Sequence, residues 1–265
     1  MPNLIKAAAA LIISAVGVHL VYLSLIRPRA ELALLAAAEQ GGAVARTLPV
    51  VLKDYEQEIC IILMFWGIYL ILEKCYAIVK HRYLFNLKLI GDEGGEDGES
   101  VDGERSTLRD MQSALRNLES LTDRETRDTP LVKTLRTAAR RYIATQDAQN
   151  TSDAIVTGVE ALAARLESGN SMIRYLIWAI PSIGFIGTVR GIGQALSQAD
   201  QALAGDISGM TNSLGIAFNS TLVALIISIF LMFLLHELQR LQDKLIVDTQ
   251  AYCEEFLLSR IEKKA

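Results

Sequence analysis

The stretch that decides the fold is residues 172–197, which read MIRYLIWAIPSIGFIGTVRGIGQALS. Its charged residues are Arg174 and Arg190, and it exceeds the roughly 20 apolar residues that a helix needs to cross the hydrocarbon core of a bilayer. Three further stretches are comparably long and apolar: residues 4–26, 58–79 and 210–235. A hydrophobic content of 51% and a net charge of -4 also suit a large soluble domain, but this segmentation favours an all-α membrane protein with four transmembrane helices.

The first stretch shares features with a secretory signal peptide, because Lys6 precedes an apolar run that is rich in alanine. Arg27, Pro28 and Arg29 follow the run without a clear small-residue cleavage motif. We therefore expect this stretch to remain in the protein as a spanning helix.

Basic residues are unevenly distributed beside the four stretches, and Lys and Arg in short flanks are retained on the cytoplasmic side of a membrane. They follow the second stretch, precede the third and follow the fourth: Lys74, Lys80, Arg82, Lys88, Arg165, Arg174, Arg240 and Lys244. The loop between the third and fourth stretches, residues 198–209, has no basic residue. This pattern predicts that both termini and the large middle segment are cytoplasmic. The first hairpin is less clearly placed, because residues 27–57 carry charges of both signs.

The sequence divides into five expected parts. Residues 1–80 form a transmembrane hairpin, and residues 81–104 form an acidic, glycine-rich linker that buries too little apolar surface to fold alone. Residues 105–171 form a helical cytoplasmic domain, residues 172–236 a channel-forming transmembrane hairpin, and residues 237–265 a cytoplasmic tail that continues the fourth helix. The helical spacing is seen at Leu131, Leu135, Ala139 and Tyr142 and again at Ile155, Val159, Leu162 and Leu166.

The third and fourth stretches each present one helical face of small and weakly polar residues. On the third these are Pro181, Gly184, Thr188, Gly191 and Ala195, and on the fourth Ser213, Ala217, Ser220, Thr221, Ala224 and Ser228. In lipid such faces normally mark close helix packing, with hydroxyls bonded to their own helix or across the interface. They can equally line a path in which hydroxyl oxygens solvate an ion or an ionisable side chain. Both readings stay open at this point.

Neither of these two stretches contains a residue suited to carry a proton. Residues 210–235 have no acidic, basic or histidine residue, and the only ionisable groups in the third stretch are arginines and a tyrosine. Proton relays through membranes use Asp, Glu or His. If an ion crosses here, we expect a partner subunit to supply the carboxylate.

Residue types argue against several other classes of protein. Cys60, Cys75 and Cys253 lack metal-ligand spacing, and the three histidines lie far apart without HExxH-type spacing. No nucleotide-binding loop or nucleophile elbow occurs. We therefore expect no metal, no cofactor, no nucleic-acid partner and no enzymatic activity.

Two segments resemble a known family. Residues 181–192, PSIGFIGTVRGI, resemble the third-helix motif of TolQ and ExbB, members of the MotA/TolQ/ExbB proton channel family, with a proline followed by glycines and a Gly-Thr-Val-x-Gly-Ile run. Residues 216–221, IAFNST, resemble the pore-facing helix of that family, where an alanine-rich stretch leads to one threonine. The resemblance covers about residues 176–245, and elsewhere it extends only to hydropathy.

The resemblance implies an ion-conducting subunit of a rotary motor or stator in the bacterial inner membrane. Five copies would surround a dimer of single-span partners like TolR, ExbD or MotB, whose membrane aspartate lies between rings of Thr188 and Thr221. The implied ion is H+, with Na+ as the alternative, since Ser220 could add an oxygen ligand. The implied pore-lining set is Thr188, Thr221, Ser220, Pro181, Gly184, Gly191, Ala217 and Ala224.

Two features depart from the TolQ and ExbB pattern. The four predicted spans are nearer in number to the flagellar MotA and PomA stators. Arg190 occupies a position that is more often bulky or apolar, and it falls near the outer interface when about 1.5 Å per residue is counted from Arg174. Arg190 is either a snorkelling arginine, a contact to a partner carboxylate, or an electrostatic plug at the channel mouth.

Two rival classes complete the expectations. A self-sufficient secondary transporter would need its own ionisable or binding groups near the membrane midplane. A membrane scaffold or signalling subunit would use the small-residue faces for packing alone, without ion conduction.

Overall fold

The structure, a computed structural model, describes residues 2–39, 47–80, 85, 108, 111–113, 115–116 and 124–255. Every element named in these ranges is helical. In chain order they are α1 (Pro2–Val21), the π-helix η1 (Tyr22–Ile26), α2 (Arg27–Glu39), α3 (Leu48–Leu52), α4 (Tyr55–Lys80), α6 (Arg124–Arg127), α7 (Pro130–Thr145), α8 (Ala148–Gly169), α9 (Ser171–Ser197), α10 (Ala199–Leu203) and α11 (Ser208–Cys253).

Four helical segments are long and apolar enough to cross a membrane: Ile5–Ala36, Tyr55–Lys80, Ala148–Ser197 and Ser208–Cys253. They contain the four stretches that the sequence predicts, so the predicted fold class is confirmed. The last segment, α11, has 46 residues and is therefore about 69 Å long at 1.5 Å per residue. Since the hydrocarbon core is about 30 Å thick, α11 continues well beyond it.

The chain divides into two compact units. The first, here called the membrane unit, comprises Met1–Glu73 and Ser171–Glu237. The second, here called the accessory unit, comprises Lys74–Asn170 and Leu238–Ala265. The five parts expected from the sequence remain predictions.

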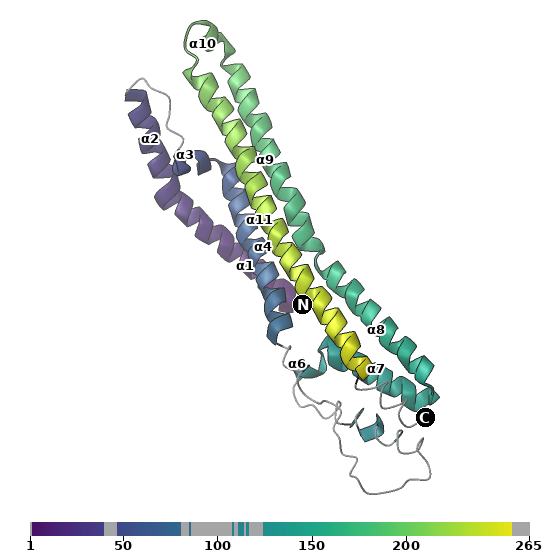
Figure 1. Cartoon of the computed structure of the whole chain (residues 1–265). Coiled ribbons are helices and arrows are strands. Elements are labelled where there is room, and N and C mark those ends of the chain that lie inside the picture. The colour runs from purple at the N-terminus through teal and green to yellow at the C-terminus, as the bar shows by residue number, and fades with distance from the viewer. Residues whose placement is uncertain are drawn as a thin grey trace. The chain divides into compact units, whose positions relative to one another are not determined.

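In the membrane unit, α9 and α11 run side by side and are joined through α10 (Figure 1). The N-terminal helix changes direction between α1 and α2, where the π-helical turn η1 interrupts the α-helical hydrogen-bond ladder (Figure 1). The indole Nε1 of Trp66 on α4 donates a hydrogen bond of 2.9 Å to the carbonyl of Ala7 on α1. Gly67 faces Leu231 of α11, so α4 contacts both the N-terminal helix and α11.

The accessory unit is built around α7 and α8. All four residues of the predicted stripe on α7 are buried, and they share a core with Ile155 and Val159 of α8 and with Tyr252 of α11. Asn170 separates α8 from α9, and its side chain forms hydrogen bonds of 2.7 and 3.3 Å with Gln242. The acidic linker lies outside the described residues, apart from Phe85.

Candidate functional site

The centre of the candidate site is a contact between two threonines. The hydroxyls of Thr188 on α9 and Thr221 on α11 are hydrogen-bonded to each other. The Thr188 hydroxyl also lies 3.1 Å from the carbonyl oxygen of Ala217, and both hydroxyls lie within 3.4 Å of the carbonyl oxygen of Gly184. Each hydroxyl has one hydrogen and two lone pairs, so the pair keeps acceptor capacity after it bonds internally. Both side chains are half-buried.

Glycines let the two helices approach closely enough for this contact. A Cβ atom on Gly184 would lie 2.5 Å from the Cβ of Ala224, and one on Gly191 would lie 2.7 Å from the backbone nitrogen of Ala217. Both separations are shorter than any allowed contact between carbon and a heavy atom. The small-residue face of α9 therefore packs directly against that of α11, as helices in lipid do when small residues permit it.

Pro181 lies inside α9 and leaves one carbonyl of that helix free. A proline has no backbone N–H, so the carbonyl of Ile177, four residues earlier, cannot receive its usual bond. The Ser228 hydroxyl of α11 donates to that carbonyl at 2.9 Å. The proline and this serine thus fix the two helices at a second point.

The structure brings the sequence-predicted site residues together at one interface. Ala217 and Ala224 are fully buried between the helices, Ser220 is 1% exposed, and Gly184 and Gly191 are buried as well. Ser220 donates its hydroxyl to the carbonyl of Ile216 on its own helix at 3.0 Å. The assignment of this set as pore-lining remains a prediction.

Arg190 forms ion pairs with carboxylates at the beginning of α4. Its Nε and Nη2 donate to the two carboxylate oxygens of Glu56 at 2.7 and 2.8 Å, and its Nη2 lies 3.7 Å from Oδ1 of Asp54. A fork of two parallel hydrogen bonds is the strongest form of such a pair. The described chain therefore supplies counter-charges for Arg190 close to the threonine pair.

A second ionic group lies next to the first. Glu58 is buried, and its oxygens contact Nδ1 of His19 at 2.6 Å and Nη2 of Arg27 at 2.7 Å. The Arg27 guanidinium also lies over the ring of Tyr55, 4.7 Å from its centroid. These contacts join α1 and α2 to the beginning of α4.

The sequence did not indicate Glu56, Glu58 and Asp54 as site residues. They lie at the beginning of the second predicted stretch or just before it, where charged residues are usual flanks of a span. The available signal was Asp54-Tyr55-Glu56-Gln57-Glu58, a run of polar residues directly before 14 uncharged ones. Ionisable residues at such a position are costly unless they are paired, so they usually have a defined partner. Arg190, whose charge departs from the TolQ and ExbB pattern, is the partner of Asp54 and Glu56, and Arg27 and His19 are the partners of Glu58.

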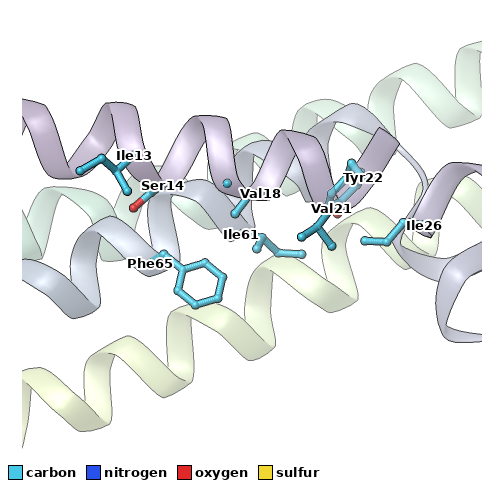
Figure 2. A pocket seen from close by; sticks show the side chains of 9 residues that line it. Ile13, Ser14, Val18, Val21, Tyr22, Ile26, Ile61 and Phe65 are labelled. Carbon is cyan, nitrogen blue, oxygen red and sulfur yellow. The ribbon is translucent and has the colours of Figure 1, made fainter. Parts of the chain in front are cut away.

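A mainly apolar cavity of about 450 Å³ lies between α1 and α4 (Figure 2). Figure 2 shows Ile61 and Phe65 of α4 facing α1 across it. Apart from Tyr22, the polar side chain in its lining is Ser14. Because apolar side chains form most of its lining, this cavity does not provide a set of groups for catalysis or ion binding.

A chain with four candidate spans and a hydroxyl pair between two of them is a multi-pass helical membrane protein. Residues 125–251 match the MotA/TolQ/ExbB proton channel family, and the chain therefore carries a domain of that family. This finding confirms the resemblance inferred from residues 181–192. The family is one of channels and not of enzymes. No curated protein matches the chain.

Proposed function

We propose that this chain is the proton-conducting subunit of a rotary motor or stator that converts the proton-motive force into work. The contact between Thr188 and Thr221 carries the proposal, because it places two hydroxyls at one point within a proton channel family domain. Five copies surround a dimer of single-span partners of TolR, ExbD or MotB type. The complex lies in the bacterial inner membrane with both termini in the cytoplasm.

The threonines act on a carboxylate that the partner supplies. A hydroxyl both donates and accepts, so Thr188 and Thr221 can hydrogen-bond the partner's aspartate in either protonation state. Protonation removes the charge of that aspartate, which changes its attraction to the polar ring and lets the partner turn. The threonines themselves do not titrate in the physiological range, so their role is solvation and not proton transfer.

The small residues of α9 and α11 hold the two threonines in contact. Pro181, Gly184 and Gly191 on α9 and Ala217, Ser220 and Ala224 on α11 set the distance between the helices, and we assign them to the channel wall. A bulkier residue at any of these positions separates the helices and moves the two hydroxyls apart.

The test replaces each threonine with valine, which has the same shape without the hydroxyl. The chain and its partner are reconstituted in liposomes, and proton uptake is measured. We expect Thr188→Val and Thr221→Val to lower the rate roughly 10- to 100-fold, since a hydrogen bond to a charged group contributes about 1.5–3 kcal/mol. The matched control is Thr211→Val, because Thr211 is exposed on α11 and bonds only the Ile207 carbonyl. Wild-type uptake in both site variants would contradict the proposal.

The burial of Ser220, Ala217 and Ala224 favours one alternative, a membrane scaffold in which these faces only pack helices. In a scaffold, Thr188→Val changes assembly but no ion-linked activity. Native mass spectrometry of the same variants separates the two functions. The channel proposal expects five copies per complex in the wild type and in both valine variants.

A further inference from the structure

Three buried polar atoms, from η1, from the residue before α4 and from the first turn of α4, have no hydrogen-bond partner in the described part of the chain. They are the Tyr22 hydroxyl, Oδ2 of Asp54 and Nε2 of Gln57. Tyr22 is 1% exposed and Gln57 is 0% exposed, so bulk solvent does not reach them. An unpaired buried polar group costs about 1–3 kcal/mol, and such groups are rare in native proteins.

These three atoms belong to one neighbourhood. The backbone N–H of Asp54 donates to Oε1 of Gln57 at 2.9 Å, which holds the Gln57 amide beside Asp54. Tyr22 lies in the chain between His19 and Arg27, both of which contact Glu58 on the first turn of α4. The mainly apolar cavity of Figure 2 offers Tyr22 little, because Ser14 is the other polar side chain in its lining.

The chemistry of the three atoms identifies the ligand class. Nε2 of Gln57 can only donate, Oδ2 of ionised Asp54 can only accept, and the Tyr22 hydroxyl can do both. A metal cation cannot accept from the amide, and an anion cannot donate to the carboxylate. Water does both, and a buried water typically has two to four such partners.

Asp54 is positioned to exchange a proton with such water. It directly precedes α4, and Gln57 makes one half of a capping box by bonding its backbone N–H. Oδ1 of the Asp54 carboxylate lies 3.7 Å from Nη2 of Arg190. Oδ2 is buried and has no hydrogen-bond partner in the described residues. Burial raises the pKa of Asp54 above its usual value. The positive charges of Lys53 and Arg190 lower this pKa, and the negative charge of Glu56 raises it, but burial has the largest effect.

Arg190 and Glu56 connect the surroundings of Asp54 to residues next to the threonine pair. Arg190 contacts Asp54 and donates to both carboxylate oxygens of Glu56. A Cβ atom on Gly187 would lie 3.2 Å from Cγ of Glu56 and 2.7 Å from Oγ of Ser220. Gly187 and Ser220 directly precede Thr188 and Thr221.

We propose that Asp54, Gln57 and Tyr22 bind water at the beginning of α4, and that Asp54 is the proton-accepting group through which protons reach the Thr188–Thr221 site. A proton that enters from the solvent on one side of the membrane is relayed by the bound water, which remains H2O, and converts the Asp54 carboxylate to the acid. It then leaves through bound water to the partner's membrane carboxylate, and Asp54 returns to its ionised form. This inference rests on the proposed function.

The proton route is tested with the full chain and its single-span partner in liposomes. Asp54→Asn keeps the size and shape of the side chain but cannot titrate, and we expect proton uptake to fall at least tenfold while the pentamer stays intact. Asp54→Glu restores a titratable group and recovers most of the uptake. Asp206→Asn is the matched control, because Asp206 is an exposed carboxylate that caps α11 through Ser208, and it should leave uptake unchanged.

The outcomes separate the two proposals. Uptake by the wild type with equal uptake by Asp54→Asn overturns the role of Asp54 and leaves the proposed function standing. No uptake by the wild type overturns both. Loss of the pentamer in Asp54→Asn indicates a structural role and also overturns the inference.

The water site has a readout independent of activity. Hydroxyl radicals generated from water by an X-ray pulse modify side chains that contact bound water, even when these side chains are buried. In the intact complex we expect Tyr22 to be modified at a rate similar to that of an exposed tyrosine such as Tyr175. Protection of Tyr22 contradicts the water site.

Discussion

At the scale of single residues, the threonine pair depends on what surrounds it. Thr188 and Thr221 meet because Gly184 lets the backbones approach, and its carbonyl oxygen lies near both hydroxyls. The two hydroxyls have four lone pairs between them, and the bond between the threonines uses one of these, so the group has unused acceptor capacity. That capacity is what a protonated partner carboxylate requires.

Gly191 and Gly193 provide a matched test of this close approach. A methyl group on Gly191 meets the backbone of Ala217, whereas one on Gly193 meets no atom within 4 Å. We expect Gly191→Ala to destabilise the protein by about 1–3 kcal/mol through overpacking. Gly193→Ala should be neutral or stabilising by up to about 1 kcal/mol, because alanine has the higher helix propensity.

Thermal unfolding of the two purified variants in the same detergent measures this difference. The midpoint should fall for Gly191→Ala and stay constant or rise for Gly193→Ala. Equal midpoints would show that α9 and α11 are not in close contact at Gly191.

At the scale of helices, the beginning of α4 connects the membrane unit. Glu56 and Asp54 pair with Arg190 of α9, and Glu58 pairs with Arg27 and with His19 of α1. In each pair, an acidic residue of α4 or of its N-terminal flank contacts a basic residue of another helix. The group therefore fixes the position of α4 relative to α1 and α9 as well as the charge near the threonines.

A double-mutant cycle on Glu56 and Arg190 measures that connection. Glu56→Gln or Arg190→Gln alone removes the paired hydrogen bonds between these side chains, whose exposures are 11% and 36%, and should cost about 1–3 kcal/mol. The double variant should cost clearly less than the sum of the two, because residues in contact are coupled.

The control cycle uses Lys133 and Asp128, a pair of 3.1 Å whose side chains are 39% and 63% exposed. Solvent screening limits such a pair to about 0–1 kcal/mol, so its coupling should be near zero. Thermal unfolding of the same preparations gives both values. Additive effects at Glu56 and Arg190 would mean that their ion pair contributes nothing to the fold.

At the scale of the whole molecule, the distribution of charge predicts the orientation in the membrane. The loop at α10 has acidic residues and no basic one, whereas basic residues such as Arg140 and Arg141 are frequent in α7. Positively charged segments beside spans are retained in the cytoplasm. We therefore expect α10 outside and α7 inside.

Labelling of single cysteines with a membrane-impermeant maleimide checks this orientation. Cys60, Cys75 and Cys253 are first replaced by serine or alanine, since all three are free thiols. In intact cells Gln201→Cys on α10 should be labelled, and Arg141→Cys on α7 should be labelled only after the membrane is opened. The reverse pattern contradicts the predicted orientation.

The sequence by itself determined the elements and the family. Four long apolar stretches, the Gly-Thr-Val-x-Gly-Ile run of residues 187–192 and the small-residue periodicity are local properties, and each is readable from neighbouring residues. The resemblance of residues 181–192 and 216–221 to the family implied Thr188 and Thr221 as a candidate pair.

Only the tertiary structure decided how distant segments combine. The contact between Glu56 and Arg190 joins residues 134 positions apart, and no local pattern specifies such a pair. The same holds for Ser228 of α11. Its hydroxyl donates to the carbonyl of Ile177 on α9, which Pro181 leaves without its usual bond. Periodicity shows which residues of one helix share a face. How two helices align along each other depends on side-chain packing across the whole membrane unit. Because of that alignment, Asp54 and Glu56 contact Arg190, two residues after Thr188.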